Sequence, residues 1–261
     1  MSALTNAIQV LRCFSMARPD LSFADVMALT GKPKSSTSRL LRSLRDCGLL
    51  EQDPHTRRYR PGLLTLELGR LHRAHDDLIA TAERELREVC ARTGQTGYIA
   101  VLDGCEQVVL RSVPGSSPLR VVNPPGQRTP ALATSNGRAM LARLSDSDIR
   151  ARVPVPYPKL PRNSPQNFRQ LMDRLNEIRR TGVSEAADES IEGVGSQGFA
   201  LASSEPGELI GIAVSYPVQA TTAAERADVR RELSAMAAKL RRLSGDPLDQ
   251  SEPTKARIIS R

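Results

Sequence analysis

The chain has 261 residues, long enough for two domains that each bury an apolar core, and its formal net charge is +8. This positive balance suits a polyanionic partner such as a nucleic acid. Tryptophan is absent and aromatic residues make up only 3% of the chain, which argues against recognition of bases by stacking on aromatic side chains.

Cysteine spacing and hydropathy exclude several further classes of protein. Cys13, Cys47, Cys90 and Cys105 are widely separated and form no C-x-x-C pair, as is usual for free thiols in a reducing compartment. No apolar run approaches the roughly 20 residues that span a bilayer, and no signal peptide is recognisable. The sequence therefore predicts a cytoplasmic protein that uses no metal, no cofactor and no membrane.

The N-terminal part of the chain contains three helical patterns in close succession. The first is expected over residues 4–17, and the second begins at Ser22, where Ser22 and Asp25 fit a capping box. The third spans residues 33–47 and is separated from the second by only a few residues around Gly31. This spacing predicts a helix-turn-helix.

The third helix separates an apolar face from a basic, hydroxyl-rich face. At about 100° per residue, its apolar side carries Thr37, Leu40, Leu41 and Leu44. The first turn and the opposite side carry Lys34, Ser35, Ser36, Ser38, Arg39 and Arg42. A basic helix face is often only solvated, but guanidinium groups also match guanine edges, and hydroxyls bond bases or phosphates. We interpret residues 33–47 as a recognition helix for the major groove of double-stranded DNA.

A basic hairpin is expected directly after this helix, and it strengthens that interpretation. Residues 49–52 and 57–60 fit two strands joined by the turn-forming sequence DPHT. Arg57 and Arg58 lie near the tip, where we expect them to contact the DNA backbone. Three helices followed by a basic hairpin predict a winged helix-turn-helix over residues 1–62.

The rest of the chain predicts a linker and a second domain of the α+β class. Leucines at helical spacing indicate a linker helix over residues 63–75 and a further helix that ends near Thr93. The later strands are expected at 98–102, 108–112, 119–122, 183–186, 198–202 and 209–216, and the later helices at 138–144, 168–181 and 223–243. Because strands and helices do not alternate regularly, residues 76–245 are expected to form an antiparallel sheet with helices. Residues 246–261 are expected to form a disordered tail.

Several sequence blocks, spread over nearly the whole chain, carry a family resemblance. The N-terminal blocks are ALTNAIQVLRCF and LSFADVMALTGKPKSSTSRLLRSLRDCGLLEQDPHTRRYRPGLLTLELG. The C-terminal blocks are VLDGCEQVVLRSVPGSSPLRV, GQRTPALATSNGRAMLA and LMDRLNEIRRTGVSEAADESIEGVGSQGFAL. Together they resemble the IclR-type bacterial transcriptional regulators. The block ATSNGRAMLA is most similar to the subgroup that controls the catabolism of protocatechuate and hydroxybenzoate.

The resemblance implies a GAF-like effector-binding domain, a homodimer formed through the N-terminal halves, and often a dimer of dimers. It also implies that a small organic or aromatic acid binds the C-terminal domain and alters DNA binding. The positions that match the family's pocket are Ser135, Asn136, Asp188, Glu189, Ala200, Ala213 and Ser215. Because no Arg or Lys is evident in this set, we expect backbone N–H groups after Asn136 to bind the acid's carboxylate.

Two departures from the family pattern affect this pocket. Ser190 stands where a second glutamate is usual, and QGFA at residues 197–200 replaces an apolar-Ala-Ala-Pro strand. Phe199 in this segment would either add an aromatic wall to the effector pocket or lie in the core. Both departures separate this chain from relatives whose effectors are known.

Three functions compete on this evidence. The first is a ligand-responsive regulator of a catabolic operon that reads a palindromic DNA operator. The alternative is an enzyme acting on a small organic acid, with Asp188 and Glu189 as acid and base. However, the chain contains no G-x-S-x-G or H-E-x-x-H motif, and all three histidines (His55, His72 and His75) precede the second domain, so we assign no catalytic residue. A structural, nucleoid-type DNA binder would not need so large a second domain.

Overall fold

The computed structural model describes residues 2–15, 17–71, 77–202, 209–244 and 246. The chain divides into two compact units, Met1–His75 and Asp76–Arg261. Each unit has a hydrophobic core of its own, and the two are described separately.

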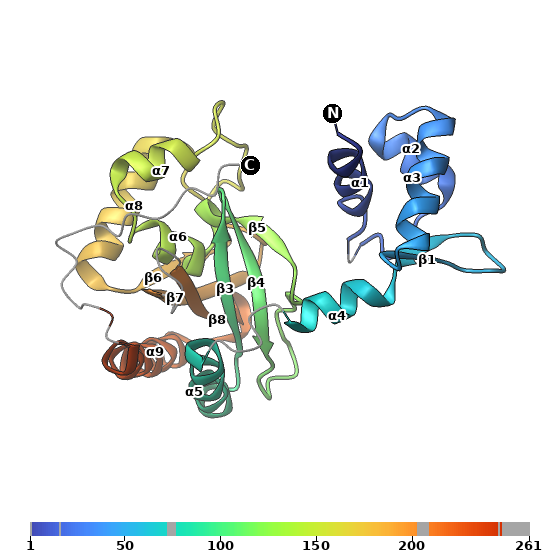
Figure 1. The fold of residues 1–261 in the computed structure, drawn as a ribbon. Coiled ribbons are helices and arrows are strands. Elements are labelled where there is room, and N and C mark those ends of the chain that lie inside the picture. The colour runs from blue at the N-terminus through green and yellow to red at the C-terminus, as the bar shows by residue number, and fades with distance from the viewer. Residues whose placement is uncertain (1, 16, 72–76, 203–208, 245, 247–261) are drawn as a thin grey trace. The chain divides into compact units, whose positions relative to one another are not determined.

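The N-terminal unit consists of helices followed by a two-stranded hairpin and a further helix (Figure 1). Its elements are α1 (Ala3–Leu11), α2 (Phe23–Thr30), α3 (Lys34–Asp46), β1 (Leu50–Gln52), β2 (Tyr59–Pro61) and α4 (Leu63–Leu71). The capping box is confirmed, because the Asp25 N–H donates to Ser22 Oγ and the Ser22 N–H donates to Asp25 Oδ2. The expected extension of the first helix to residue 17 is wrong. A bridge between Ser15 and Arg18 turns the chain back soon after α1 ends.

The core of this unit is formed by side chains from the three helices and the hairpin. From α3 it receives Thr37, Leu41 and Leu44, which follow one another at spacings of four and three residues. Leu40, which the spacing also places on the apolar side, packs against this core but is only half-buried. Leu41 is fully buried and is therefore the main core residue of α3.

The C-terminal unit is an α+β domain built on one antiparallel sheet. Its helices and 3₁₀ turns are α5 (Asp77–Thr93), η1 (Ala131–Ala133), α6 (Ser135–Leu141), α7 (Asp146–Arg152), α8 (Phe168–Thr181), η2 (Val218–Ala220) and α9 (Ala223–Ser244). Its strands are β3 (Thr96–Asp103), β4 (Glu106–Val113), β5 (Arg128–Pro130), β6 (Ser184–Ala187), β7 (Val194–Ala202) and β8 (Leu209–Pro217). They are ordered β5-β4-β3-β8-β7-β6, and every neighbouring pair is antiparallel, as the sequence predicts.

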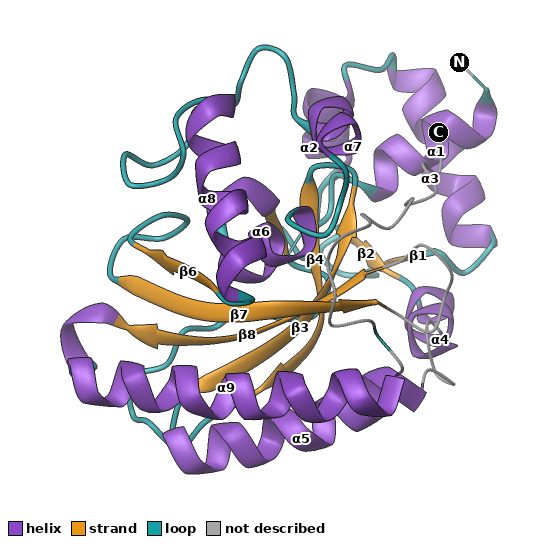
Figure 2. Ribbon diagram, turned by 90° about the vertical axis from the view of Figure 1, so that its left-hand side faces the viewer, coloured by secondary structure: helices purple, strands orange, loops and turns teal. Residues whose placement is uncertain are grey.

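Helices cover both faces of this sheet. Figure 2 shows α5 and α9 along one face and α6 with α8 on the other. Because side chains alternate along a strand, Phe199 and Ile212 enter the core beneath α5 and α9, whereas Ala200 packs toward α6 and α8. Helix α6 lies very close to β8, since a Cβ at Gly211 would come within 2.8 Å of the Asn136 carbonyl oxygen.

Two segments of the C-terminal unit differ from the prediction. Residues 119–122 form no strand, and the outer neighbour of β4 in the sheet is β5. Val121 is nevertheless buried, and its carbonyl accepts a hydrogen bond of 2.5 Å from the Tyr98 hydroxyl. The apolar pattern at 119–122 therefore reflects packing rather than strand pairing. Helix α7 was not predicted; it begins after Ser145, whose Oγ accepts from the N–H of Asp148.

The end of α9 is tied to the rest of the domain. Asp246 is buried, and its carboxylate forms an ion pair of 2.5 Å with Arg143, so the predicted disorder does not begin at residue 246. The remainder of the predicted tail, residues 247–261, lies outside the described residues. In the described part of the chain, no helix combines the length and the apolar character that crossing a membrane requires.

Candidate functional site

The exposed face of α3 gathers the side chains predicted to contact DNA. Lys34, Ser35, Ser38, Arg39 and Arg42 are exposed, and Ser36 is half-buried. Among the described residues, no carboxylate pairs with Arg39 or Arg42, so both guanidinium groups are available for base edges or phosphates. Pro33 caps α3 without a side-chain hydrogen bond, so the first-turn N–H groups remain available for a phosphate oxygen.

The two arginines predicted for the wing have different surroundings. Arg57 is exposed at the tip of the β1–β2 turn, with a left-handed φ of 59°. Arg58 turns back toward α2, where its guanidinium pairs with Asp20 and, at 3.3 Å, with Asp25. Hydrogen bonds from the Ser22 N–H and hydroxyl, together with the nearby Arg58, hold the pKa of Asp25 below its usual range. Arg58 therefore fastens the wing to the start of α2, and Arg57 is the freer of the two.

The α6 face of the sheet carries small and hydroxyl side chains in register. Thr96, Ser215 and Ser196 lie side by side across β3, β8 and β7. The next row along the strands consists of Tyr98, Ala213, Gly198 and Ser184. Of the predicted effector residues, this face unites Ala200, Ala213 and Ser215 with Ser135 and Asn136, which are buried in the first turn of α6.

Three hydroxyl groups on this side of the sheet are buried without a hydrogen-bond partner in the described structure. They are Ser135 Oγ, Ser184 Oγ and Thr96 Oγ1. A buried hydroxyl without a partner is unfavourable by about 1–3 kcal/mol, and native proteins keep few of them. Because they are concentrated on one face of the sheet, this face is the candidate site for a polar ligand.

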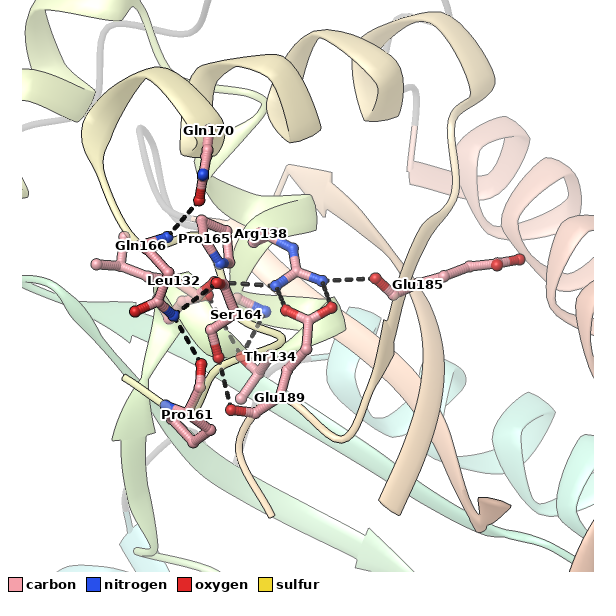
Figure 3. A network of polar contacts seen from close by, with 12 residues as sticks. Leu132, Thr134, Arg138, Pro161, Ser164, Pro165, Gln166, Gln170, Glu185 and Glu189 are labelled. Atoms are coloured by element: carbon pink, nitrogen blue, oxygen red, sulfur yellow. Dashed lines mark hydrogen bonds and ion pairs between the residues drawn. The ribbon is translucent and has the colours of Figure 1, made fainter. Parts of the chain in front are cut away.

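A buried ion pair lies one turn further along α6 (Figure 3). Arg138 is fully buried and holds Glu189 through both terminal nitrogens, with an Nη2–Oε1 distance of 3.0 Å. The same guanidinium donates to the carbonyl oxygens of Leu132 at 2.9 Å and Glu185 at 2.5 Å. The Ser164 hydroxyl donates to the backbone oxygen of Glu189 at 2.6 Å. These bonds join α6, η1 and β6 to the loop that precedes β7.

Arg138 is a buried charged residue beside the predicted pocket that the sequence analysis did not identify. We expected no cation near the predicted pocket, yet Arg138 lies one helical turn from Ser135 and supplies a buried charge. A signal was present, because Arg138 is the only charged residue in the block ATSNGRAMLA, whose other residues are small, apolar or uncharged polar. A lone arginine in such a helix is rarely buried without a carboxylate partner.

The remaining predicted pocket residues are placed differently. Asp188 has a left-handed φ of 55°, and its carboxylate accepts the Gly193 N–H at 2.6 Å, which closes the loop between β6 and β7. Phe199 lies in the core on the α5 and α9 face, which is the second of its two expected positions. It therefore contributes no wall on the side of Ser135 and Ser215.

Comparison with known proteins decides which family these two units represent. Residues 3–54 match the model of the IclR helix-turn-helix domain, and residues 71–242 match the model of the C-terminal domain of the bacterial transcriptional regulator IclR. The chain belongs to the IclR family of bacterial transcriptional regulators. The predicted resemblance and the predicted α+β architecture are thereby confirmed.

Sequence similarity to curated IclR-family regulators extends over most of the chain. HTH-type transcriptional regulator XynR of Escherichia coli is 26% identical over 248 residues, which cover 95% of this chain and 98% of XynR. HTH-type transcriptional regulator TtgV of Pseudomonas putida is 29% identical over 194 residues, or 74% of each chain. Both of these relatives are regulators of transcription by name.

Solved IclR structures share the fold. An IclR transcriptional regulator from Alicyclobacillus acidocaldarius superposes with a TM-score of 0.79 at 22% identity, covering 93% of this chain and 98% of that one. An IclR homolog from Microbacterium hydrocarbonoxydans, solved in complex with 4-hydroxybenzoate, superposes with a TM-score of 0.76 at 20% identity. The superposition covers 92% of this chain and 100% of the homolog.

Proposed function

We propose that this IclR-family regulator reads a palindromic operator with α3 and controls a catabolic operon in response to a small organic or aromatic acid. The acid binds on the α6 face of the C-terminal domain and changes the affinity for DNA, a coupling of about 1–3 kcal/mol between the two sites. A homodimer, or a dimer of dimers, supplies the two-fold symmetry that a palindrome requires. Such a protein acts in the cytoplasm, where the operator is.

The observation that carries the effector site is the group of unpartnered hydroxyls of Ser135, Ser184 and Thr96 on one face of the sheet. Each hydroxyl both donates and accepts, so together they complement a carboxylate and a phenol. The relative solved with 4-hydroxybenzoate supports an aromatic acid of this kind. Arg138 provides positive charge nearby, although Glu189 engages both of its terminal nitrogens.

The alternative function, an enzyme, would need Asp188 and Glu189 as acid and base, and both carboxylates are engaged elsewhere. Glu189 is held in the buried ion pair with Arg138, and Asp188 accepts the Gly193 N–H within its own loop. Both carboxylates are thus engaged in contacts within the protein, which supports a binding role over catalysis. The named relatives are transcriptional regulators, in agreement with a binding role.

Replacing Arg39 with alanine should lower affinity for the operator by about 1–3 kcal/mol and leave affinity for random DNA nearly unchanged, because a base-reading guanidinium is lost. Fluorescence anisotropy with operator and scrambled duplexes measures the difference. Arg45→Ala is the matched control, since Arg45 pairs with Asp46 at the far end of α3. Equal losses of Arg39→Ala on both duplexes would mean that Arg39 contacts only phosphate.

Replacing Arg57 with alanine should weaken binding to all DNA sequences alike. It should also reduce the slope of log affinity against log salt by roughly 0.9, the change expected for one lost phosphate contact. Titrations at several salt concentrations measure the slope. Arg58→Ala should change the slope less, because Asp20 and Asp25 already pair with Arg58. An unchanged slope in Arg57→Ala would remove the wing tip from the DNA interface.

Replacing Ser215 with tryptophan should abolish the response to the effector without unfolding the protein, because the indole would fill the α6 face. An acid that binds only the folded state should stabilise the parent protein by about 2.7 kcal/mol at 100 times its Kd. Thermal melts and operator titrations with 4-hydroxybenzoate and related acids measure both responses. A folded Ser215→Trp variant that still responds would show that the effector binds elsewhere.

A further inference from the structure

A cleft of about 710 Å³ lies where the start of α9 meets the edge of the sheet formed by β6, β7 and β8. Its volume is in the range of small-molecule sites. The helix side is one face of α9 with Ala223, Arg226, Ala227 and Arg230, which are related in pairs by separations of three or four residues. Gln197 on β7 and Tyr216 on β8 line the cleft from the sheet, on the face opposite to Ser215.

Gln197 holds a buried acceptor that has no partner. The residue is 4% exposed, and its amide nitrogen donates to the Tyr216 hydroxyl at 3.3 Å and to the Arg226 carbonyl at 3.2 Å. Since a carbonyl can only accept, the amide nitrogen must face Arg226, and this fixes the orientation of the amide. Within the described part of the chain, Oε1 of Gln197 receives no hydrogen bond. Gln197 therefore contributes to the cleft lining an acceptor that has no donor in the described structure.

Tyr216 is held rigidly beside this amide. Its ring packs against Gly195, where a Cβ would come within 2.4 Å of the ring carbon Cε2. Burial raises the pKa of Tyr216, so the phenol keeps its proton at neutral pH. Because the hydroxyl oxygen accepts from Gln197, its proton is directed to another acceptor. Gln197 thus offers one acceptor, Oε1, and Tyr216 offers one donor, its hydroxyl proton, and both side chains are fixed in position.

The charge of the cleft is positive. Its two glutamates are both neutralised, Glu185 by Arg230 at 2.7 Å and Glu189 by the buried Arg138. Arg174 and Arg226 also line the cleft, and neither pairs with a carboxylate among the residues described. The Nε of Arg226 makes only a long bond of 3.4 Å to the Thr222 carbonyl. Two arginines are therefore available to an anion.

We propose that this cleft, which at the β6 edge is lined from both sides of the sheet, is a second ligand site for a small carboxylate that also bears hydroxyl groups. Arg226 and Arg174 bind the carboxylate, one hydroxyl donates to Gln197 Oε1, and another accepts from Tyr216. An acid without hydroxyls gives Gln197 no donor, and a neutral polyol gives the arginines no charge. Both features are needed in one molecule. The site does not depend on which effector binds the α6 face.

Isothermal titration of the full chain with three six-carbon probes tests this chemistry. D-gluconate has the carboxylate and the hydroxyls, hexanoate has only the carboxylate, and sorbitol has only hydroxyls. Gluconate should bind at least about tenfold more tightly than either of the others. Equal binding of all three probes, or no binding of gluconate up to about 10 mM, would overturn the proposal.

Variants locate the bound probe. Arg226→Gln and Gln197→Leu should each weaken gluconate binding about tenfold or more, whereas Arg231→Gln should leave it unchanged. Arg231 is the matched control, because it is an exposed arginine on α9 that pairs with Asp228 and does not line the cleft. Ser215→Trp should also leave gluconate binding intact, which separates this site from the proposed effector site. Binding that survives Arg226→Gln, or that is lost in Ser215→Trp, would place gluconate elsewhere.

Discussion

Replacing Glu189 with leucine should lower the free energy of unfolding of the C-terminal domain by about 3–5 kcal/mol. The variant leaves the guanidinium of Arg138 fully buried without its counter-charge, and two of its hydrogen bonds are lost. Because domains are stabilised by only about 5–15 kcal/mol, this is a large fraction of the total. Urea unfolding followed by far-ultraviolet circular dichroism measures the loss.

Two further variants test whether the loss of stability in Glu189→Leu comes from the unpaired buried charge of Arg138. The double variant Arg138→Met/Glu189→Leu should recover most of the lost stability, since it removes both charges together. Glu185→Leu is the surface control, because the Glu185 carboxylate pairs with Arg230 in a half-exposed position, and it should change stability by no more than about 1 kcal/mol. A Glu189→Leu protein as stable as the parent would show that Arg138 finds another counter-charge in solution.

Replacing Leu41 with alanine should destabilise the N-terminal unit by about 2–5 kcal/mol, the range for a fully buried leucine. Leu41 packs where α3 meets the rest of the helix-turn-helix core, so operator binding should fall with the folded fraction. Leu40→Ala is the matched control on the neighbouring residue and should have a smaller effect, because Leu40 is half-buried. Thermal melts of the two variants give the comparison. A larger effect at Leu40 would mean that α3 is rotated from the orientation described here.

The N-terminal unit could be predicted from the sequence because its signals are local. The Ser22–Asp25 capping box, the Gly31 turn and the leucine spacing of α3 all involve residues within two turns of one another. Leu40, also predicted on the apolar side, is only half-buried, whereas Leu41, about 100° further around the helix, is fully buried. Periodicity locates an apolar face, but the exact centre of that face depends on what packs against it.

The effector face could be predicted only in part, because it depends on contacts between distant segments. Ser135 and Ser215 came from family resemblance, and strand register places Ser215 beside Thr96 on the α6 side. The pairing of Arg138 with Glu189 joins positions in different sequence blocks, and nothing in the spacing of either block indicates it. Phe199 shows the same difficulty, since alternation separates the two faces of β7 but does not say which helices cover each face.

The order of the strands has a consequence for how the chain is made. β3 lies between β4 and β8, and Tyr98 pairs with Ala213, so the centre of the sheet joins segments far apart in the sequence. On the ribosome, one edge of β3 stays unpaired until β8 has been synthesised, and such edges invite aggregation. The N-terminal unit, whose contacts lie within its own residues, can fold long before that. Each newly made copy can therefore acquire its DNA-reading half first, and its sensing half only after β8 has been synthesised.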